Sequence, residues 1–172
     1  MGDVDGFDLV PAHLAVQAMR DNGYRNAAYA AAELIDNSIQ AGATVVELLV
    51  REETELVQAR RRSRIREIAV LDNGIGMDSA TLRRALQFGN GTHLDDRSGI
   101  GRFGMGLPSA SISQCQRVDV WSWQDGIENA IHTHIDLGLV AKRVMREVPD
   151  PGSRDIPEFW LQSGLAFGAS GT

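Results

Sequence analysis

The sequence is poor in residues that would indicate covalent cross-linking or insertion into a membrane. Among its 172 residues only Cys115 is a cysteine, so no disulfide can form within the chain. No apolar run is long enough to span a bilayer, and the N-terminal stretch MGDVDGFDLV lacks the basic start and apolar middle of a signal peptide. These absences predict a soluble, cytoplasmic protein with no membrane partner.

Lysine is also scarce, because Lys142 is the only lysine among 17 basic residues. A mechanism that needs a lysine has this single candidate, far along the chain from the motifs described below. The formal net charge of -6 argues against general attraction to nucleic acid. The arginines of residues 60–66 form a basic cluster that could contact nucleic acid or an acidic partner. The nearby Glu52, Glu53 and Glu55 favour a solvated hairpin tip instead.

The pattern of apolar residues predicts one α+β domain. Hydrophobic residues make up 43% of the chain and charged residues 23%, which is ordinary globular composition. Helical spacing predicts helices over residues 11–23, 25–43, 78–89 and 107–115. Strand-like runs cover residues 44–50, 65–74, 117–124 and 129–137, and the charged segment 51–64 is expected to be an exposed extension or hairpin. We therefore expect a two-layer α/β sandwich with helices packed on one mixed, mostly antiparallel sheet.

No repeat and no linker divide the chain. We expect residues 1–172 to form a single domain that is the N-terminal piece of a longer protein.

The segment ELIDNSIQAG, residues 33–42, places polar side chains on an otherwise apolar helix. Glu33 and Asn37 are four residues apart and therefore share one helical face, with Asp36 beside them. Carboxylate and amide oxygens are ligands that Mg²⁺ accepts, and a glutamate can deprotonate a water molecule. A stripe that simply faces solvent is the alternative.

The segment LDNGIGMD places Asp72 at the end of an apolar run, with Gly74 and Gly76 after it. A carboxylate at a strand end, beside glycines that permit close approach to the backbone, suits the binding of a flat polar group. An ordinary Asp-Asn-Gly turn is the alternative interpretation.

The segment SGIGRFGMGLPSAS, residues 98–111, is rich in glycine and precedes a predicted helix. Its backbone N–H groups could surround a phosphate, and the helix N-terminus would add partial positive charge. The spacing of Gly99, Gly101 and Gly104 matches the dinucleotide fingerprint, but that fingerprint must directly follow a strand, and THLDDRS is not strand-like. No Gly-Lys-Ser/Thr phosphate loop is present. A merely flexible loop is the alternative.

Together, the order and spacing of these three segments resemble the GHKL ATPase superfamily. This superfamily comprises the ATPase subunits of type II topoisomerases, heat-shock chaperones of the ninety-kilodalton class, histidine kinases and MutL mismatch-repair proteins. ELIDNSIQAGAT with LDNGIGMD is most similar to the MutL, chaperone and microrchidia branches. The resemblance covers approximately residues 10–137 and implies a sandwich of the Bergerat type.

The resemblance implies that the domain binds ATP with Mg²⁺ and hydrolyses it to ADP and phosphate. Glu33 would be the catalytic general base that activates the attacking water, and Asn37 would bind the metal. Asp36 would support the site rather than act in it. Asp72 would accept a hydrogen bond from the adenine amino group. The adenine would lie close to the backbone of the segment that contains Gly74, Gly76 and Met77.

On the phosphate side, the resemblance implies a mobile lid over residues 89–106. The cofactor-binding residues there would be Gly101, Arg102, Phe103, Gly104, Met105 and Gly106. Several branches place a lysine from a following domain against the γ-phosphate. Arg102 could supply that charge instead, or it could be a solvated loop arginine. Thr172, in the closing SGT, could begin the threonine motif that contacts the adenine side.

The superfamily also implies that lid closure is coupled to dimerisation, so we expect a homodimer on ATP binding and a client that the sequence does not name. One alternative function is an ATP-sensing module that binds without turnover. Another is a histidine kinase catalytic domain, against which the missing upstream phosphoacceptor helix argues. The isolated chain could bind ATP yet hydrolyse it weakly.

Five further residues lie outside these motifs. His132 and His134 are two residues apart on an expected strand and point the same way, but a metal site would need further ligands. Trp121 and Trp123 share a strand face and are expected to pack in the core or at an interface. Cys115 is expected to behave as a buried, small apolar residue.

Overall fold

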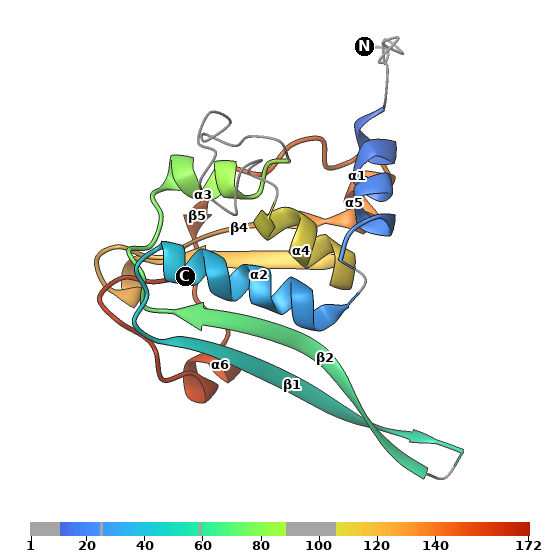
Figure 1. Ribbon diagram of the computed structural model, residues 1–172, viewed down its shortest axis with the longest axis horizontal. Coiled ribbons are helices and arrows are strands. Elements are labelled where there is room, and N and C mark those ends of the chain that lie inside the picture. Colours follow the sequence, from blue (N-terminus) through green and yellow to red (C-terminus); the bar gives the residue numbers. More distant parts are fainter. Residues whose placement is uncertain (1–10, 25, 59, 89–105) are drawn as a thin grey trace.

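The computed structural model describes residues 11–24, 26–58, 60–88 and 106–172. Helices and antiparallel strands are combined in this part of the chain, which confirms the predicted α+β class (Figure 1). The helices are α1 (Ala12–Asp21), α2 (Ala27–Gln40), α3 (Ser79–Ala85), α4 (Gly106–Gln114), α5 (Leu137–Ala141) and α6 (Glu158–Ser163), with a 3-10 turn η1 (Ile127–Asn129). The strands are β1 (Val46–Val57), β2 (Arg60–Asp72), β3 (Arg117–Ser122), β4 (Ile131–Asp136) and β5 (Gly152–Ser153).

Strands β1 and β2 form one long antiparallel hairpin. Its register runs from the pair Val46 and Asp72 to the pair Val57 and Arg60, with an irregularity between Arg51 and Glu52. The charged segment 51–64 therefore continues both predicted strands, in agreement with the expected hairpin. Figure 1 shows its far end projecting beyond the helices.

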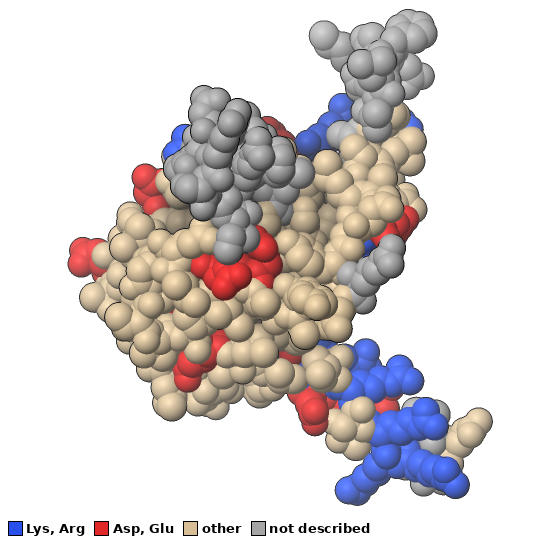
Figure 2. All heavy atoms as spheres, viewed as in Figure 1, with Lys and Arg blue, Asp and Glu red and all other residues tan. Residues whose placement is uncertain are grey.

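The far end of this hairpin is strongly basic, and Figure 2 shows its Lys and Arg atoms gathered there. Part of the charge is balanced as predicted: Arg66 pairs with Glu53 and Glu55, and Arg64 lies 3.9 Å from Glu55. These side chains are largely exposed to water, so the pairs contribute little stability. The role of the arginine cluster stays a prediction.

Strands β3, β4 and β5 form a second antiparallel sheet. The β3–β4 register runs from the pair Arg117 and Asp136 to the pair Ser122 and Ile131, which confirms the hairpin predicted from the alternating sequence. Strand β5 adds two residues beside the start of β4.

The described strands thus lie in two sheets, whereas the sequence led us to expect one mixed sheet. The difference arises because only Gly171 and Thr172 form backbone hydrogen bonds between β2 and the end of β3. Gly171 exchanges two such bonds with Trp123, and Thr172 exchanges two with Asp72, at N–O distances of 2.9 to 3.4 Å. Paired exchange of this kind is antiparallel. The closing residues therefore run opposite to both β2 and the end of β3, so β2 and β3 run in the same direction.

Alternation along β2 sends neighbouring side chains to opposite faces of the hairpin. Asp72 faces α2, where it meets Ser38. Leu71 faces the other way and packs with Trp123, Ala130 and Ala166 in one of two apolar clusters. The segment after α6 covers this second face, since the Leu165 and Ala166 amides both donate to Glu47 at 2.7 Å. The hairpin is therefore covered on both faces near Asp72.

The second apolar cluster joins the helices to the β3–β4 sheet. Its buried members are Leu86, Ile112, Ile135, Leu137 and Val148, and residues of α1 and α4 pack around them. This cluster fixes the start of α4 against the sheet.

Three of the remaining sequence expectations can be compared with the structure. Trp123 is buried, with 2% of its surface exposed, and Trp121 packs against the same cluster, which confirms core packing for both. Cys115 is half-buried rather than buried. Its Sγ–H donates to the Ser111 carbonyl, and burial raises the pKa of the thiol. Within the described residues, no helix has both the length and the apolar character needed to cross a bilayer.

Candidate functional site

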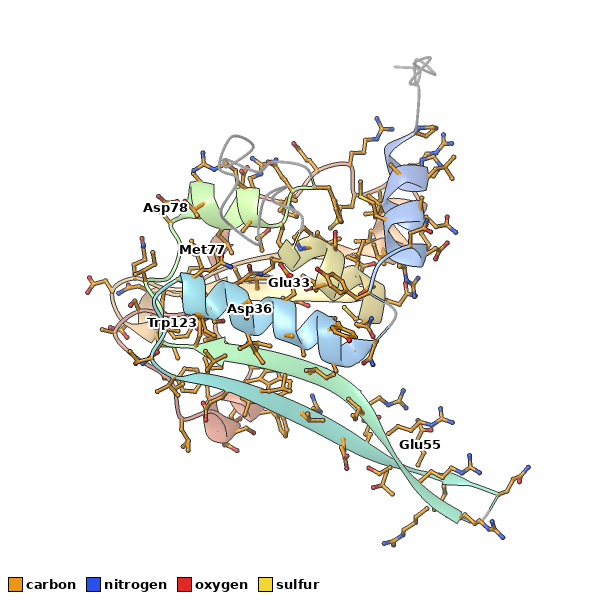
Figure 3. The ribbon with its side chains drawn as sticks, in the orientation of Figure 1. Glu33, Asp36, Glu55, Met77, Asp78 and Trp123 are labelled. Atoms are coloured by element: carbon orange, nitrogen blue, oxygen red, sulfur yellow. The ribbon has the colours of Figure 1, made fainter. Side chains whose placement is uncertain are left out.

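Helix α2 holds the first polar group of the site. The Asn26 side chain caps its N-terminus by accepting from the Ala28 amide at 2.8 Å, and the alanine run that follows favours helix. The helix ends before Gly42, whose φ of 74° suits glycine. Within α2, Glu33 and Asn37 are one helical turn apart. Figure 3 shows Glu33 and Asp36 on this helix. Figure 2 shows an acidic patch in the same place.

Glu33 is held between two other segments. The Tyr24 hydroxyl donates to its Oε2 at 3.1 Å. Gly106, the first residue of α4, lies so close that a Cβ there would overlap the Glu33 Oε1. Burial, and secondarily the negative charge of Glu33, raises the pKa of Tyr24, so the phenol stays a proton donor at neutral pH. The carboxylate is therefore positioned where α2 meets α4.

Asp72 is a buried acid, with 5% of its surface exposed. Its Oδ2 accepts from the Ser38 hydroxyl at 2.8 Å, and its Oδ1 accepts from the Gly74 amide at 2.9 Å. Each carboxylate oxygen can accept two hydrogen bonds, so both retain capacity for a ligand donor. A buried, partly satisfied acceptor of this kind can select a ligand that carries an N–H group.

The turn after Asp72 is tied to both neighbouring elements. The Ile75 amide donates to the Ala41 carbonyl at 3.0 Å, and the Met77 amide donates to the Ser122 hydroxyl at 2.8 Å. Gly76 has a φ of 64°, and a Cβ there would overlap the carbonyl oxygen of Trp123. Glycine is required at this position by both the backbone conformation and the space. Figure 3 places Met77 and Asp78 between the end of β2 and α3.

Thr172 lies directly beside Asp72 through the backbone pairing described above. Its hydroxyl is 2.9 Å from the Ser122 hydroxyl, which also donates to the Gly171 carbonyl at 2.9 Å. Ser122 thereby joins the turn at Met77 to the closing residues of the chain. Residues a hundred positions apart in sequence are thus brought to one place.

One continuous cavity of about 1250 Å³ connects most of these groups. The site residues that line it are Asn37, Ser38, Asp72, Gly76, Met77, Gly106 and Thr172. This volume exceeds the usual range for a small-molecule site, because the cavity also extends along β3 to Asp119, Trp121 and Arg154. The part between α2, the Asp72 turn and α4 is the candidate ligand site.

The structure therefore brings together predicted residues from α2, the Asp72 turn and the end of the chain. Glu33 and Gly74 do not line the cavity, but Glu33 abuts Gly106 and Gly74 donates to Asp72. Predicted residues Gly101, Arg102, Phe103, Gly104 and Met105 lie outside the described residues. The cavity is not lined by Lys142.

Sequence reasoning did not select four residues that the site contains. Ser38 and Ser122 hold the Asp72 region, Tyr24 holds Glu33, and Arg84 of α3 lines the cavity. Ser38 carried a usable signal, because a serine next to Asn37 on an apolar helix invites a polar partner. Tyr24, Arg84 and Ser122 have no local pattern that would distinguish them.

Two comparisons with known proteins place the chain among its relatives. Residues 24–172 match the family described as histidine kinase-, DNA gyrase B-, and HSP90-like ATPase. An 84-residue stretch is 34% identical to the protein named ATPase MORC2B of Mus musculus. That alignment covers 48% of this chain and 8% of the mouse protein, so the chain spans only a small part of that relative. The second match agrees with the resemblance to the microrchidia branch.

Proposed function

The chain belongs to the histidine kinase-, DNA gyrase B- and HSP90-like ATPase family, and from this membership we propose that it binds ATP with Mg²⁺ and hydrolyses it to ADP and phosphate. The observation that carries the proposal is the convergence of Asn37, Asp72, Gly76 and Thr172 on one cavity, with Glu33 held against its Gly106 wall.

The adenine would bind at the Asp72 end of the cavity. The Asp72 carboxylate is held in one orientation by the Ser38 hydroxyl and the Gly74 amide. Its oxygens can therefore accept a further hydrogen bond from a ligand donor in a defined position. The exocyclic amino group of adenine is such a donor, whereas guanine presents a carbonyl oxygen at the corresponding position. Gly76 and Met77 line the cavity beside Asp72, which lets a flat base lie near the backbone.

The metal and the attacking water would lie toward the α4 end. Mg²⁺ is usually bound through one or two protein oxygens together with substrate phosphates and waters, so a single amide ligand, Asn37, suits it. When bound, Mg²⁺ would neutralise phosphate charge. One turn earlier, Glu33 would accept the proton of the attacking water as a general base, and the Tyr24 hydroxyl would keep its carboxylate in place.

Arg84 of α3 is a candidate source of positive charge near the phosphates. Arg84 lines the cavity and could place its charge toward a bound phosphate. The same charge also acts on Asp78, whose pKa is lowered chiefly by hydrogen bonding to Thr81 and further by Arg84. Dimerisation on ATP binding, implied by the family resemblance, stays a prediction.

Titration with a non-hydrolysable ATP analogue, with and without Mg²⁺, tests binding. We expect saturable affinity that increases with Mg²⁺, and the absence of affinity under both conditions would overturn the proposal. The Glu33→Ala variant then distinguishes an ATPase from a module that only senses ATP. An ATPase loses turnover by roughly 10²–10⁴-fold while binding is retained. An ATP sensor shows no turnover to lose, and a histidine kinase domain would transfer phosphate to a partner histidine instead of releasing it.

A matched control is Glu158→Gln, on α6, whose carboxylate accepts only from Gln162 in the described part of the chain. It should leave both binding and turnover unchanged.

A further inference from the structure

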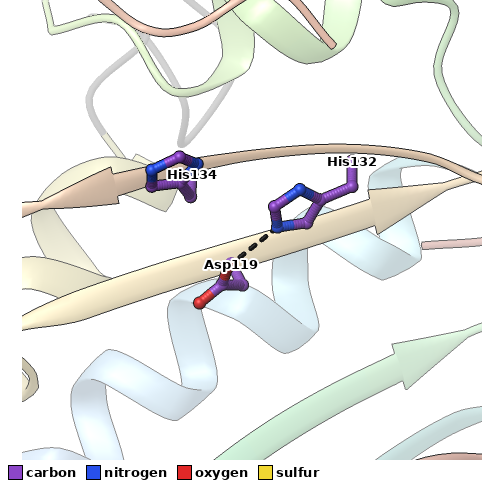
Figure 4. A group of neighbouring side chains, drawn as sticks. All are labelled: Asp119, His132 and His134. Carbon is purple, nitrogen blue, oxygen red and sulfur yellow. Dashed lines mark hydrogen bonds and ion pairs between the residues drawn. The ribbon is translucent and has the colours of Figure 1, made fainter. Parts of the chain in front are cut away.

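Two histidines and an aspartate meet on the β3–β4 sheet, away from the residues assigned to ATP. Asp119 lies on β3, His132 and His134 lie on β4, and one ligand atom from each falls within 4.8 Å of the other two. Figure 4 shows the three side chains on the same side of the two strands. We propose that Asp119, His132 and His134 bind a divalent transition metal ion, with Zn²⁺ the best match to the donors.

The strand register explains why these residues meet. Asp119 is directly opposite His134 in the β3–β4 pairing, and His132 is two residues before His134, so all three share one face. The imidazole rings of His132 and His134 are nearly parallel, with centroids 5.7 Å apart. The sequence offered two possible ligands, and the fold supplies the third from the neighbouring strand.

The distances require only small side-chain movements to enclose a metal. Zn²⁺ binds imidazole nitrogen and carboxylate oxygen at about 2.0–2.2 Å, which sets ligand atoms roughly 3.3 Å apart around a tetrahedral centre. The His132 Nε2 and the Asp119 Oδ1 are already 2.8 Å apart. The metal would take the place of the proton that these atoms share.

The donor set argues for a transition metal rather than Mg²⁺. Imidazole suits Zn²⁺, Cu²⁺ and Ni²⁺, whereas Mg²⁺ prefers oxygen ligands. Neutral imidazole is the form of histidine that binds metal. Three protein ligands leave one tetrahedral position for water or an external group.

Two arginines compete with the metal for Asp119 to different degrees. Arg117 donates to both Asp119 oxygens, at 2.7 and 2.9 Å, and its bond to Oδ2 would support a carboxylate that binds metal through Oδ1. Arg154 lies 3.9 Å from Asp119 Oδ1 and is largely exposed. The Arg154 charge repels a metal ion, but its guanidinium makes no close hydrogen bond to Asp119 that would have to break. Removing that charge should therefore strengthen metal binding.

The cluster is accessible from the large cavity, because Asp119 and Trp121 both line it. Trp121 also provides a reporter, since its ring centroid is 4.5 Å from that of His132. Its indole N–H is buried and has no hydrogen-bond partner among the described residues. A paramagnetic ion bound to His132 would therefore lie close enough to Trp121 to quench its fluorescence.

The test is titration of the whole 172-residue chain with Co²⁺ and Zn²⁺ in the absence of nucleotide. We expect Co²⁺ to give the visible absorption of a low-coordinate site and to quench tryptophan fluorescence, and Zn²⁺ to displace it in a one-to-one ratio. Trp121→Phe should abolish most of the quenching while the absorption remains. Absence of both signals would overturn the proposal.

Variants separate this site from adventitious binding. His134→Ala and His132→Ala should each weaken binding by at least ~100-fold, more than loss of an outer-shell partner costs. His134 is half-buried, so His134→Ala keeps the test decisive if the buried His132 proves necessary for folding. His13→Ala, on α1, is the matched control and should leave binding unchanged. Arg154→Gln should tighten binding several-fold. Equal binding by His134→Ala and the parent chain would contradict the assignment.

Discussion

The Ser38 hydroxyl donates a 2.8 Å hydrogen bond to the Asp72 carboxylate, and both residues are buried. This contact joins α2, which carries the expected metal ligand, to the end of β2, which carries the expected adenine acceptor. It connects the two halves of the candidate site through side chains. Removing a hydrogen-bond donor from a buried carboxylate lowers the stability of the folded state. The contact should therefore affect both the free energy of unfolding and ligand binding.

The first prediction concerns Ser38→Ala, which removes one of the two donors described for Asp72. We expect the free energy of unfolding to fall by about 1–3 kcal/mol, because a buried charged acceptor is left less satisfied. The affinity for an ATP analogue should also fall, since the carboxylate is no longer fixed. Urea unfolding and analogue titration measure these effects.

Ser113→Ala is the matched control. The Ser38 and Ser113 hydroxyls both lie within hydrogen-bond distance of a carbonyl of their own helix, Leu34 and Ala110 respectively, but Ser113 contacts no acid in the described structure. Equal effects of the two substitutions on nucleotide affinity would show that the Ser38 contact has no special role.

The second prediction concerns adenine selection by Asp72. Asp72→Asn keeps the shape of the side chain but replaces one acceptor oxygen with a donor amide. Affinity for an ATP analogue should fall roughly tenfold to a hundredfold, the value of a hydrogen bond to a charged group. Affinity for a GTP analogue should change much less. Asp125→Asn, at an exposed turn, should alter neither affinity, and parallel losses for both nucleotides would refute adenine readout by Asp72.

The sequence was sufficient for the parts of the site that depend on local geometry. Glu33 and Asn37 are one helical turn apart, and Asp72 with Gly76 lies in a single turn, so spacing and turn chemistry predict where these side chains point. The family resemblance then assigned them roles, which stay predictions.

Long-range pairing is what the sequence did not provide. Thr172 reaches Asp72 only through backbone hydrogen bonds between segments a hundred residues apart, and no local pattern of Ser122 indicates its contact with Met77. The β3–β4 hairpin was predicted, but its register was not, and that register decides that Asp119 faces His134. The division into two sheets depends on the same long-range pairings.

The third prediction concerns the glycine at the Asp72 turn. Gly76→Ala should lower the free energy of unfolding by about 2–5 kcal/mol, combining a positive φ with an overlap against a backbone carbonyl that has little freedom to move. Gly42→Ala is the control, because Gly42 also has a positive φ but open space around it. It should cost only about 1–2 kcal/mol. Thermal unfolding compares the two, and equal losses would contradict the close approach of Gly76 to Trp123.

The fourth prediction uses Cys115, the only thiol in the chain. Because burial raises its pKa, the folded protein contains less thiolate at pH 7–9 than the unfolded chain, whose thiol has a pKa of about 8.5. A disulfide reagent that reacts with thiolate should therefore modify the folded protein more slowly than the protein in urea. The difference between the two modification rates should become smaller as the pH rises, because the folded thiol then also ionises. Identical rates in the two states would show that the thiol is freely exposed.

The last prediction concerns the contact between Gly106 and Glu33. A methyl group in Gly106→Ala would overlap the Glu33 Oε1, which is the end of a flexible side chain, so the carboxylate can move aside without disrupting the fold. The backbone N–H of residue 106 is retained. If Glu33 is the general base, as proposed, ATP turnover should fall because its carboxylate is displaced, while the melting temperature and the affinity for an ATP analogue stay near their original values. Gly152→Ala, with open space around it, should change none of these quantities. Unchanged turnover in Gly106→Ala would mean that the position of the Glu33 carboxylate against α4 does not govern the reaction.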